Sequence, residues 1–197
     1  MTRPRTFDRD AAARKAMELF WKQGYAATSY GDITAHLGLG RGSLYAAYGS
    51  KEGLFLAALD QYRERGLAFL HAALSEGRPV RESLHAFMSG RLEESVTDPL
   101  QRGCLLVNSI TERLPHDAAA AEFARSMQAA NTDAIAAALD GASARGELRA
   151  DTDSAAIAAF LVTVLNGVMV SVKVRPDQAE LSRTIDLALG VVDACQA

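Results

Sequence analysis

The sequence of 197 residues contains only two cysteines, Cys104 and Cys195. They match neither the paired spacing of a zinc site nor the disulfide framework of a small secreted domain. The histidines are scattered, at His36, His71, His85 and His116. No His-Glu-x-x-His motif and no Ser–His–Asp order accompanies them. We therefore expect no metal site, no cofactor and no enzyme.

The sequence pattern also indicates neither a targeting segment nor a membrane span. The first residues are charged and lack the apolar centre of a signal peptide. The longest apolar run, 155–172, is interrupted by Thr163 and Asn166, which favours a buried helix over a membrane span. We expect a cytoplasmic, reduced protein with no membrane partner.

Strand patterns are scarce, because β-branched residues rarely alternate with polar ones, and alanine is abundant. Hydrophobic residues make up 49% of the chain and charged residues 23%, which is ordinary for a globular protein. A chain of this length buries enough surface for one or two packed units. The composition predicts an all-α fold.

Charge is distributed unevenly along the chain. The net charge is −3, which does not suggest a nucleic-acid-binding protein. Residues 1–51, however, hold eight Lys and Arg against four Asp and Glu, so they carry +4 and the remainder carries −7. A basic head on an acidic body is expected when only the head meets phosphate, although chance scatter gives the same split.

A short helix is predicted over residues 30–37. Ser29 is a suitable N-cap, and Asp32 occupies the capping-box position three residues later. Ile33 and Leu37 are four residues apart and share one helix face. Gly38 follows at once and adopts the left-handed conformation that ends many helices.

A second short helix is predicted over residues 41–48. Its spacing turns Leu44 and Tyr48 inward and leaves Arg41, Tyr45 and Ala47 facing outward. Two short helices around a glycine turn form a helix-turn-helix, whose second helix enters the DNA major groove. Shape alone leaves open a protein that does not touch DNA.

The residues themselves resemble the TetR family of bacterial repressors. The resemblance is carried by residues 16–25, 28–29, 32–34, 37–38, 42–45 and 50–54, at the family's spacing. It covers about the first quarter of the chain, and the rest matches only in length and in helical, apolar character. It implies a DNA-binding head, residues 1–51, and a helical effector-binding and dimerisation domain, residues 52–197. It also implies a homodimeric transcriptional repressor that a small-molecule effector releases from a palindromic double-stranded operator.

The resemblance also implies which residues meet DNA. They are Thr28, Ser29, Tyr30, Arg41, Gly42, Ser43, Tyr45, Ala46, Ala47, Tyr48 and Lys51. Arg41 suits the acceptors of guanine, and Lys51 suits the phosphate backbone. Many relatives carry a larger aromatic residue or His where Ala46 and Ala47 stand. This departure supports the alternative function, a helical ligand-binding or assembly module that has lost DNA binding.

The N-terminal arm before the first helix contains two more basic residues, Arg3 and Arg5. Basic arms reach phosphates or the minor groove in other DNA-binding proteins. A solvated tail is the interpretation that we favour here.

The body is expected to consist of helices over residues 52–75, 80–96, 101–112, 117–144, 153–174 and 178–195. The first of these starts beside the head and ends inside the body, so it is the natural transmitter between them. Only Gly66 interrupts its pattern.

The family's effector-binding region implies a cavity among the larger side chains of the body. The candidates are Tyr62, Phe69, Phe87, Met88, Cys104, Asn108, Phe123, Met127 and Phe160, although core packing is the default interpretation of such residues. Cys104 lies in a segment similar to one in regulators that sense electrophiles through cysteine, and nearby Arg102 would favour the thiolate. A buried, inert Cys104 is the alternative.

The last two long helices of the family pair with their copies in a dimer. Here the corresponding apolar residues are Phe160, Val164, Val168, Val172, Leu181, Ile185 and Leu189. Burial of these helices within one subunit remains the alternative.

Overall fold

The described part of the chain, residues 8–75 and 77–197 of a computed structural model, folds into nine α-helices and no β-strand. The helices are α1 (Arg9–Gln23), α2 (Tyr30–Leu37), α3 (Arg41–Tyr48), α4 (Lys51–Ser75), α5 (Val80–Thr97), α6 (Leu105–Arg113), α7 (Ala118–Ala144), α8 (Ser154–Val174) and α9 (Gln178–Asp193). This confirms the all-α prediction. The arm with Arg3 and Arg5 lies outside the described residues.

Four of the helices begin in the same way. Asp8, Asp117, Asp153 and Asp177 each accept a backbone N–H from the first turn of the helix that follows, which satisfies one of its unpaired donors. The helix predicted over residues 101–112 starts later, at Leu105. The reason is backbone conformation, because Gln101 and Gly103 have positive φ values of 49° and 65°.

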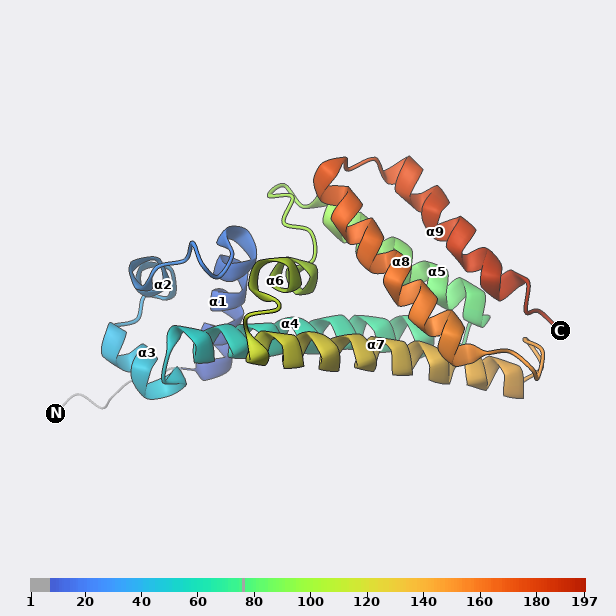
Figure 1. Cartoon of the computed structure of the whole chain (residues 1–197), viewed down its shortest axis with the longest axis horizontal. Helices are drawn as coiled ribbons and strands as arrows, with labels where there is room; N and C mark the ends of the chain where they lie inside the picture. Colours follow the sequence, from blue (N-terminus) through green and yellow to red (C-terminus); the bar gives the residue numbers. More distant parts are fainter. Residues whose placement is uncertain (1–7, 76) are drawn as a thin grey trace.

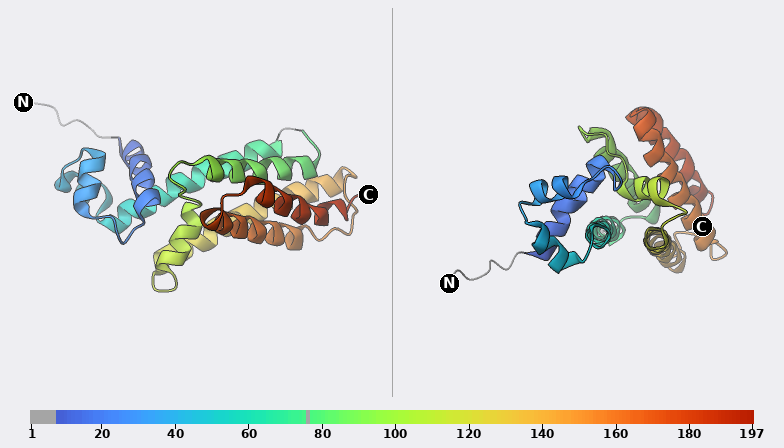
Figure 2. Two further views of the ribbon diagram at one scale, coloured as in Figure 1. Left: turned by 90° about the horizontal axis from the view of Figure 1, so that it is seen from above. Right: turned by 60° about the vertical axis from the view of Figure 1, so that its left-hand side comes forward.

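The helices form two parts that share one long element (Figure 1). We call α1–α3 the head and α4–α9 the body. Helix α4 starts next to α3, packs along α1 of the head, and continues beside α7 of the body. Helices α8 and α9 lie side by side and pack on α5, at the end remote from α3 (Figures 1 and 2).

The core runs without interruption from the head into the body. Phe20 of α1 meets Phe55 of α4 edge to face, with ring centroids 5.1 Å apart, and both side chains are fully buried. Burial of each of these side chains stabilises the fold by about 1.5–3 kcal/mol. Gly66 does not break α4, which remains helical through this position. A continuous core and an unbroken α4 couple the position of the head to the packing of the body.

Helix α8 is apolar on two faces. The helix is long and apolar enough by composition to cross a membrane: its most apolar 18-residue window has a mean hydropathy of 2.2. Only 33% of that window is buried in the single chain. The prediction of a buried helix therefore holds for one face only. The exposed residues recur at helical spacing, at Ala156, Phe160, Thr163, Gly167, Val170 and Val174. This stripe remains uncovered within one chain.

Candidate functional site

Helix α2 begins with the predicted capping box. The Asp32 N–H donates to Ser29 Oγ at 3.1 Å, and the Ser29 N–H donates to the Asp32 carboxylate at 2.8 Å. The Ser29 hydroxyl also donates to Asp32, and this bond is the main reason that the pKa of Asp32 lies below its usual value. Gly38, at φ 66°, ends the helix as predicted. The capping box fixes where the first helix of the pair begins.

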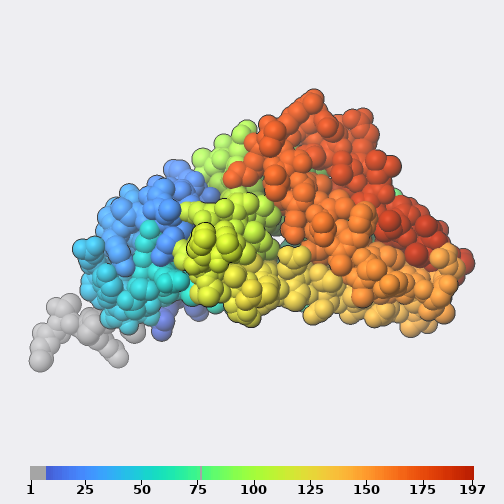
Figure 3. All heavy atoms as spheres, viewed as in Figure 1, coloured from blue at the N-terminus to red at the C-terminus, as the bar shows by residue number. Residues whose placement is uncertain are grey.

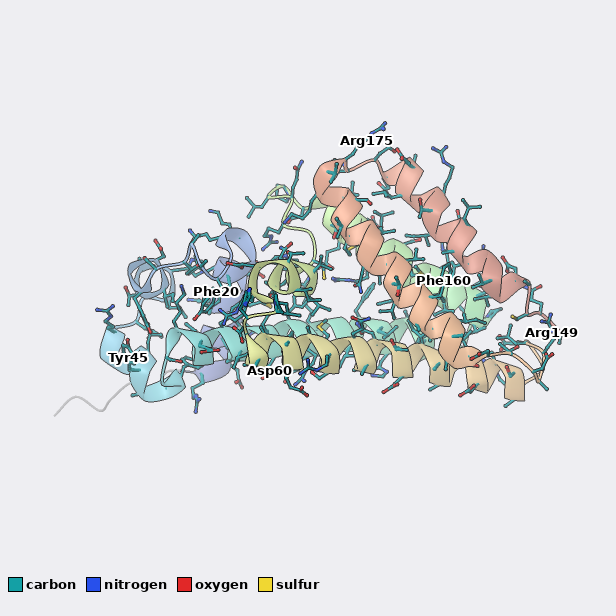
Figure 4. The ribbon with its side chains drawn as sticks, viewed as in Figure 1. Phe20, Tyr45, Asp60, Arg149, Phe160 and Arg175 are labelled. Atoms are coloured by element: carbon teal, nitrogen blue, oxygen red, sulfur yellow. The ribbon has the colours of Figure 1, made fainter. Side chains whose placement is uncertain are left out.

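Helix α3 presents most of its surface to solvent. Leu44 is buried against the head, whereas Arg41, Gly42, Ser43, Tyr45 and Ala46 are exposed. Its N-cap, Gly40, supplies no side chain to the free N–H groups of the first turn. These donors and the positive end of the helix dipole are thus open to an anion. Tyr45 lies at the end of the molecule far from α8 (Figure 4).

Tyr30 connects the starts of α2, α3 and α4. Its ring stacks on Tyr45 with centroids 5.5 Å apart, and the Arg41 guanidinium lies 4.8 Å from its centre. Its hydroxyl accepts the Lys51 N–H at 3.0 Å. The hydrogen bond from Tyr45, and then that from the Lys51 backbone, lower the pKa of Tyr30. Three residues predicted to meet DNA are thereby held around one phenol ring.

Arg41 and Lys51 place two cations around Tyr30. Neither Arg41 nor Lys51 forms an ion pair with any of the residues that the structure describes. Lys51 Nζ rests 4.3 Å from the centre of the Tyr25 ring. Neutralising phosphates and releasing their counterions is what such cations do when DNA binds.

Two residues predicted to contact DNA form hydrogen bonds within the head. Thr28 is fully buried, and its hydroxyl donates to the Gly24 carbonyl at 2.6 Å, so it is not placed to meet a phosphate. Tyr48 is half-buried, and its hydroxyl donates to the Arg9 carbonyl at 2.5 Å. Both side chains hold α1 against the helix pair.

A small interior cavity of about 40 Å³ lies in the body. Phe87, Cys104 and Met127 line it, as predicted, together with residues that the sequence analysis missed. These are Gly66, Arg91, Leu106, Asn131, Leu165, Asn166 and Met169. Arg91 was detectable, because it follows Met88 by three residues on the inward face of its helix.

A hydrogen-bonded chain runs beside this cavity. Arg91 donates to the Tyr62 hydroxyl at 2.7 Å, and Tyr62 donates to Cys104 Sγ at 3.3 Å. Burial raises the pKa of Tyr62 far above its usual value. Arg102, which we expected beside Cys104, binds Glu18 and Asp98 instead. The partners of the thiol are therefore a phenol and, behind it, a different arginine.

The other effector candidates do not gather at the interior cavity. Phe69 is 41% exposed and Phe160 is 43% exposed, and neither lines the cavity, although the Phe69 ring centroid lies 6.0 Å from that of Phe87. Met88 and Phe123 are buried in the core without lining the cavity. Asn108 lies in a different cleft.

That second cleft lies between the head and the body and has a volume of about 320 Å³. It is bounded by α1 and its following turn, by the loop before α6, by α6 itself and by Lys173 of α8. In the space-filling view α6 abuts the head directly (Figure 3).

Direct hydrogen bonds join α6 and its loop to α1. The Glu112 carboxylate accepts the N–H groups of Tyr25 and Ala26 at 3.0 and 2.7 Å. The Trp21 Nε1–H donates to the Gly103 carbonyl at 3.0 Å. Trp21 of the head thereby reaches the body. The turn after α1 is therefore held by the body.

The predicted dimer residues divide between two surfaces. Val168, Val172, Leu181, Ile185 and Leu189 are buried within a single chain, so they cannot form an interface. Phe160 is exposed and Val164 is half-buried. The prediction is wrong for those five residues, because their side chains pack within one chain.

The comparisons with known proteins agree with this architecture. Residues 13–58 match the family described as "Bacterial regulatory proteins, tetR family", and residues 80–188 match the "Tetracyclin repressor-like, C-terminal domain". The chain belongs to the TetR family. It is a DNA-binding transcriptional regulator and not an enzyme. The C-terminal domain of TetR regulators is their dimerisation and effector-binding module, so operator DNA and a second copy of the chain are its partners.

Individual TetR relatives cover nearly the whole chain. The HTH-type transcriptional repressor ComR of Escherichia coli is 33% identical, over 94% of this chain and 88% of ComR. The uncharacterised regulator YezE of Bacillus subtilis is also 33% identical, over 98% and 100%. A cysteine mutant of the TetR regulator CifR, solved with 26-bp double-strand operator DNA, is 32% identical with a TM-score of 0.86, over 95% of this chain and 98% of CifR.

Proposed function

We propose that this chain is a cytoplasmic repressor that binds a palindromic operator as a homodimer and leaves it when a small molecule binds the body. The observation that carries the proposal is the exposed surface of α3. Arg41 of α3 and Lys51 at the start of α4 lie around Tyr30 without a carboxylate partner among the described residues. A helix of this kind enters the major groove, and two copies one DNA turn apart read a palindrome.

The proposed roles at the DNA follow from exposure and chemistry. Arg41 reads guanine through its two parallel donors, and Tyr45 and Ser43 bind beside it. Ala46, Ala47 and Gly42 allow a close approach, and Lys51, Ser29 and the first N–H groups of α3 hold phosphates. Tyr30 arranges these groups. Base readout therefore depends mainly on Arg41.

The proposed dimer surface is the exposed stripe of α8, with Phe160, Val170 and Val174, together with Leu187 of α9. Leu187 and Val174 are 80% and 83% exposed. Large apolar side chains seldom remain so exposed in a stable monomer, and two small residues of the stripe, Ala156 and Gly167, allow close helix packing. A groove of about 590 Å³ between α8 and α9 extends this surface.

The proposal is tested with a reporter gene placed behind the DNA upstream of the protein's own gene. We expect the chain to lower reporter expression at least tenfold, and Arg41→Ala to remove most of this repression at equal protein level. Expression that rises with the chain would indicate an activator. If expression does not respond to the chain, the upstream DNA does not contain its operator, and the repression proposed at this DNA is wrong.

A further inference from the structure

Glu112, near the end of α6, binds the turn that joins α1 to α2. One oxygen of its carboxylate accepts the Tyr25 N–H at 3.0 Å, and the other accepts the Ala26 N–H at 2.7 Å. Hydrogen bonds from backbone N–H groups to a carboxylate are charge-assisted and stronger than neutral ones. We propose that Glu112 is a positioning residue for operator binding, which sets the spacing between half-sites that the dimer accepts; this inference rests on the proposed repressor function.

The turn is shaped to receive this carboxylate. Gly24 begins it with a φ of 80°, in the left-handed region that favours glycine. A Cβ atom at this position would lie 3.1 Å from one carboxylate oxygen of Glu112 and 3.3 Å from the other, closer than ordinary van der Waals contact. Glycine therefore permits both the conformation of the turn and the close approach of Glu112.

The turn leads directly into the DNA-binding helices. It ends at Ser29, the N-cap of α2. The preceding residue, Thr28, donates its hydroxyl hydrogen to the Gly24 carbonyl at 2.6 Å, which ties the start of α2 to the beginning of the turn. Tyr30, the first residue of α2, stacks on Tyr45 of α3. A shift of the turn relative to α6 therefore moves the start of α2 and, with it, the recognition helix.

Helix α6 is also tied to α8, the helix that carries the proposed dimer stripe. Lys173 Nζ of α8 donates to Asn108 Oδ1 of α6 at 2.9 Å, and the Asn108 amide donates to the Arg102 carbonyl at 2.8 Å. In the loop before α6, a Cβ atom at Gly103 would lie 3.0 Å from side-chain carbons of Lys173, so this loop lies directly against α8. Helix α6 and its loop therefore connect the helix of the proposed dimer surface with the head.

This connection determines where the two heads of a dimer lie. The distance between the recognition helices depends on the position of each head relative to α8. On DNA, one added base pair moves a half-site by about 3.4 Å and rotates it by about 35°. A head that is held in one position selects one spacing, whereas a head with more freedom tolerates several.

The expected effect of Glu112 is on the position of the head and not on its folding. Glu112 and Ala26 are exposed and Tyr25 is half-buried, so water replaces the carboxylate at small cost when Glu112 is removed. The bond from Trp21 to Gly103 still holds α1 against the body. The turn beyond α1 then loses its two bonds to α6, and the start of α2 gains freedom.

The test compares the full-length wild type with three variants, Glu112→Ala, Glu112→Gln and Glu82→Ala. The first removes both acceptors and the second keeps one carbonyl oxygen. The third is the control, because Glu82 is an exposed glutamate in the first turn of α5. Fluorescence anisotropy at low salt measures the affinity for the palindromic duplex from upstream of the gene, for duplexes with one base pair inserted or removed at its centre, and for a duplex with a single half-site. Circular dichroism confirms that the variants are folded.

Wild type and Glu82→Ala are expected to prefer the natural spacing by about tenfold over the altered spacings. In Glu112→Ala this preference should fall to about threefold or less, while the affinity for the single half-site stays unchanged. Glu112→Gln should fall between the two.

Three outcomes overturn the inference. They are a wild-type spacing preference in Glu112→Ala, a wild type that binds all spacings equally, and a loss of half-site affinity as large as the loss of affinity for the palindrome. The last result would show that Glu112 supports the fold of the head rather than its position. A wild type that binds neither the palindrome nor the half-site rejects the proposed function itself.

Discussion

The Arg113 guanidinium of α6 lies 3.6 Å from the centre of the Tyr25 ring, in the turn that follows α1. On the same ring, 4.3 Å from its centre, lies the ammonium of Lys51. Tyr25 thus contacts one cation from the body and one cation at the proposed DNA surface. Because Arg113 also pairs with Glu52 at 3.5 Å, the end of α6 contacts the first turn of α4 as well. A displacement of α6 therefore reaches Lys51 through direct contacts.

This contact predicts a stability effect for Arg113→Ala. The side chain is largely buried and also pairs with Asp117, so its removal leaves the largely buried Asp117 carboxylate without a cation, bonded only to the Ala120 N–H. We expect the free energy of unfolding to fall by about 3 kcal/mol. Urea denaturation at fixed protein concentration measures it. The control is Arg125→Ala, whose ion pair is solvent-exposed and contributes less than about 1 kcal/mol. Equal losses in the two variants would contradict the role given to Arg113.

Arg41 and Lys51 are expected to contribute to DNA binding in different ways. Arg41→Ala should reduce discrimination between operator and shuffled DNA by about 1–3 kcal/mol, because it removes a base contact. Lys51→Ala should weaken binding to both DNAs about equally and reduce the slope of log affinity against log salt by about one. Titrations at several salt concentrations separate the two patterns. If both variants bind the operator as the wild type does, the docking of α3 described above is wrong.

Tyr30 predicts a pH dependence of operator binding. The hydrogen bonds from Tyr45 and from the Lys51 backbone lower its pKa, so the phenolate forms at a lower pH than in an ordinary tyrosine. A negative charge beside Arg41 repels phosphate, so affinity should be retained below this pKa and fall as the pH rises through it. Tyr30→Phe keeps the ring and lacks the ionisable group, and its affinity should decline less between neutral and alkaline pH. Parallel pH profiles of the two proteins would argue against this assignment.

The exposed stripe of α8 and its neighbour Leu187 predict the oligomeric state. Leu187→Glu or Val174→Glu places a charge in the proposed interface, and either should shift the protein from dimer to monomer and weaken operator binding at least tenfold. Analytical ultracentrifugation measures the mass. Leu100→Glu is the matched control, since Leu100 is a 53% exposed leucine in the loop before α6. A dimer that persists in both α8 and α9 variants would place the interface elsewhere.

Local signals in the sequence were sufficient to predict much of the structure of the head. The capping box of Ser29 and Asp32, the turn at Gly38 and the inward position of Leu44 all depend on spacing within one or two helix turns. The burial of Thr28 was not predictable in this way. Its hydroxyl donates to the Gly24 carbonyl. A serine or threonine near a helix start is equally compatible with exposure to solvent and with a buried hydrogen bond.

In the body the sequence identified helices but not which of their faces meet. Helix α8 is apolar around most of its circumference, so periodicity could not separate the face that packs on α5 and α9 from the exposed stripe. The cleft between α1 and α6 was also invisible, because its walls come from segments that lie 80 or more residues apart, as Trp21 and Gly103 do. Tertiary packing decides both features.

The measurement that tests the central claim most directly is fluorescence anisotropy of the purified protein with DNA from upstream of its own gene. A shuffled DNA serves as the control, and each titration is made at two salt concentrations. The account predicts tight binding to the upstream DNA, saturation at two chains per site, and weaker binding at the higher salt. Failure to bind either DNA at low salt would contradict it and would favour a helical module that has lost DNA binding.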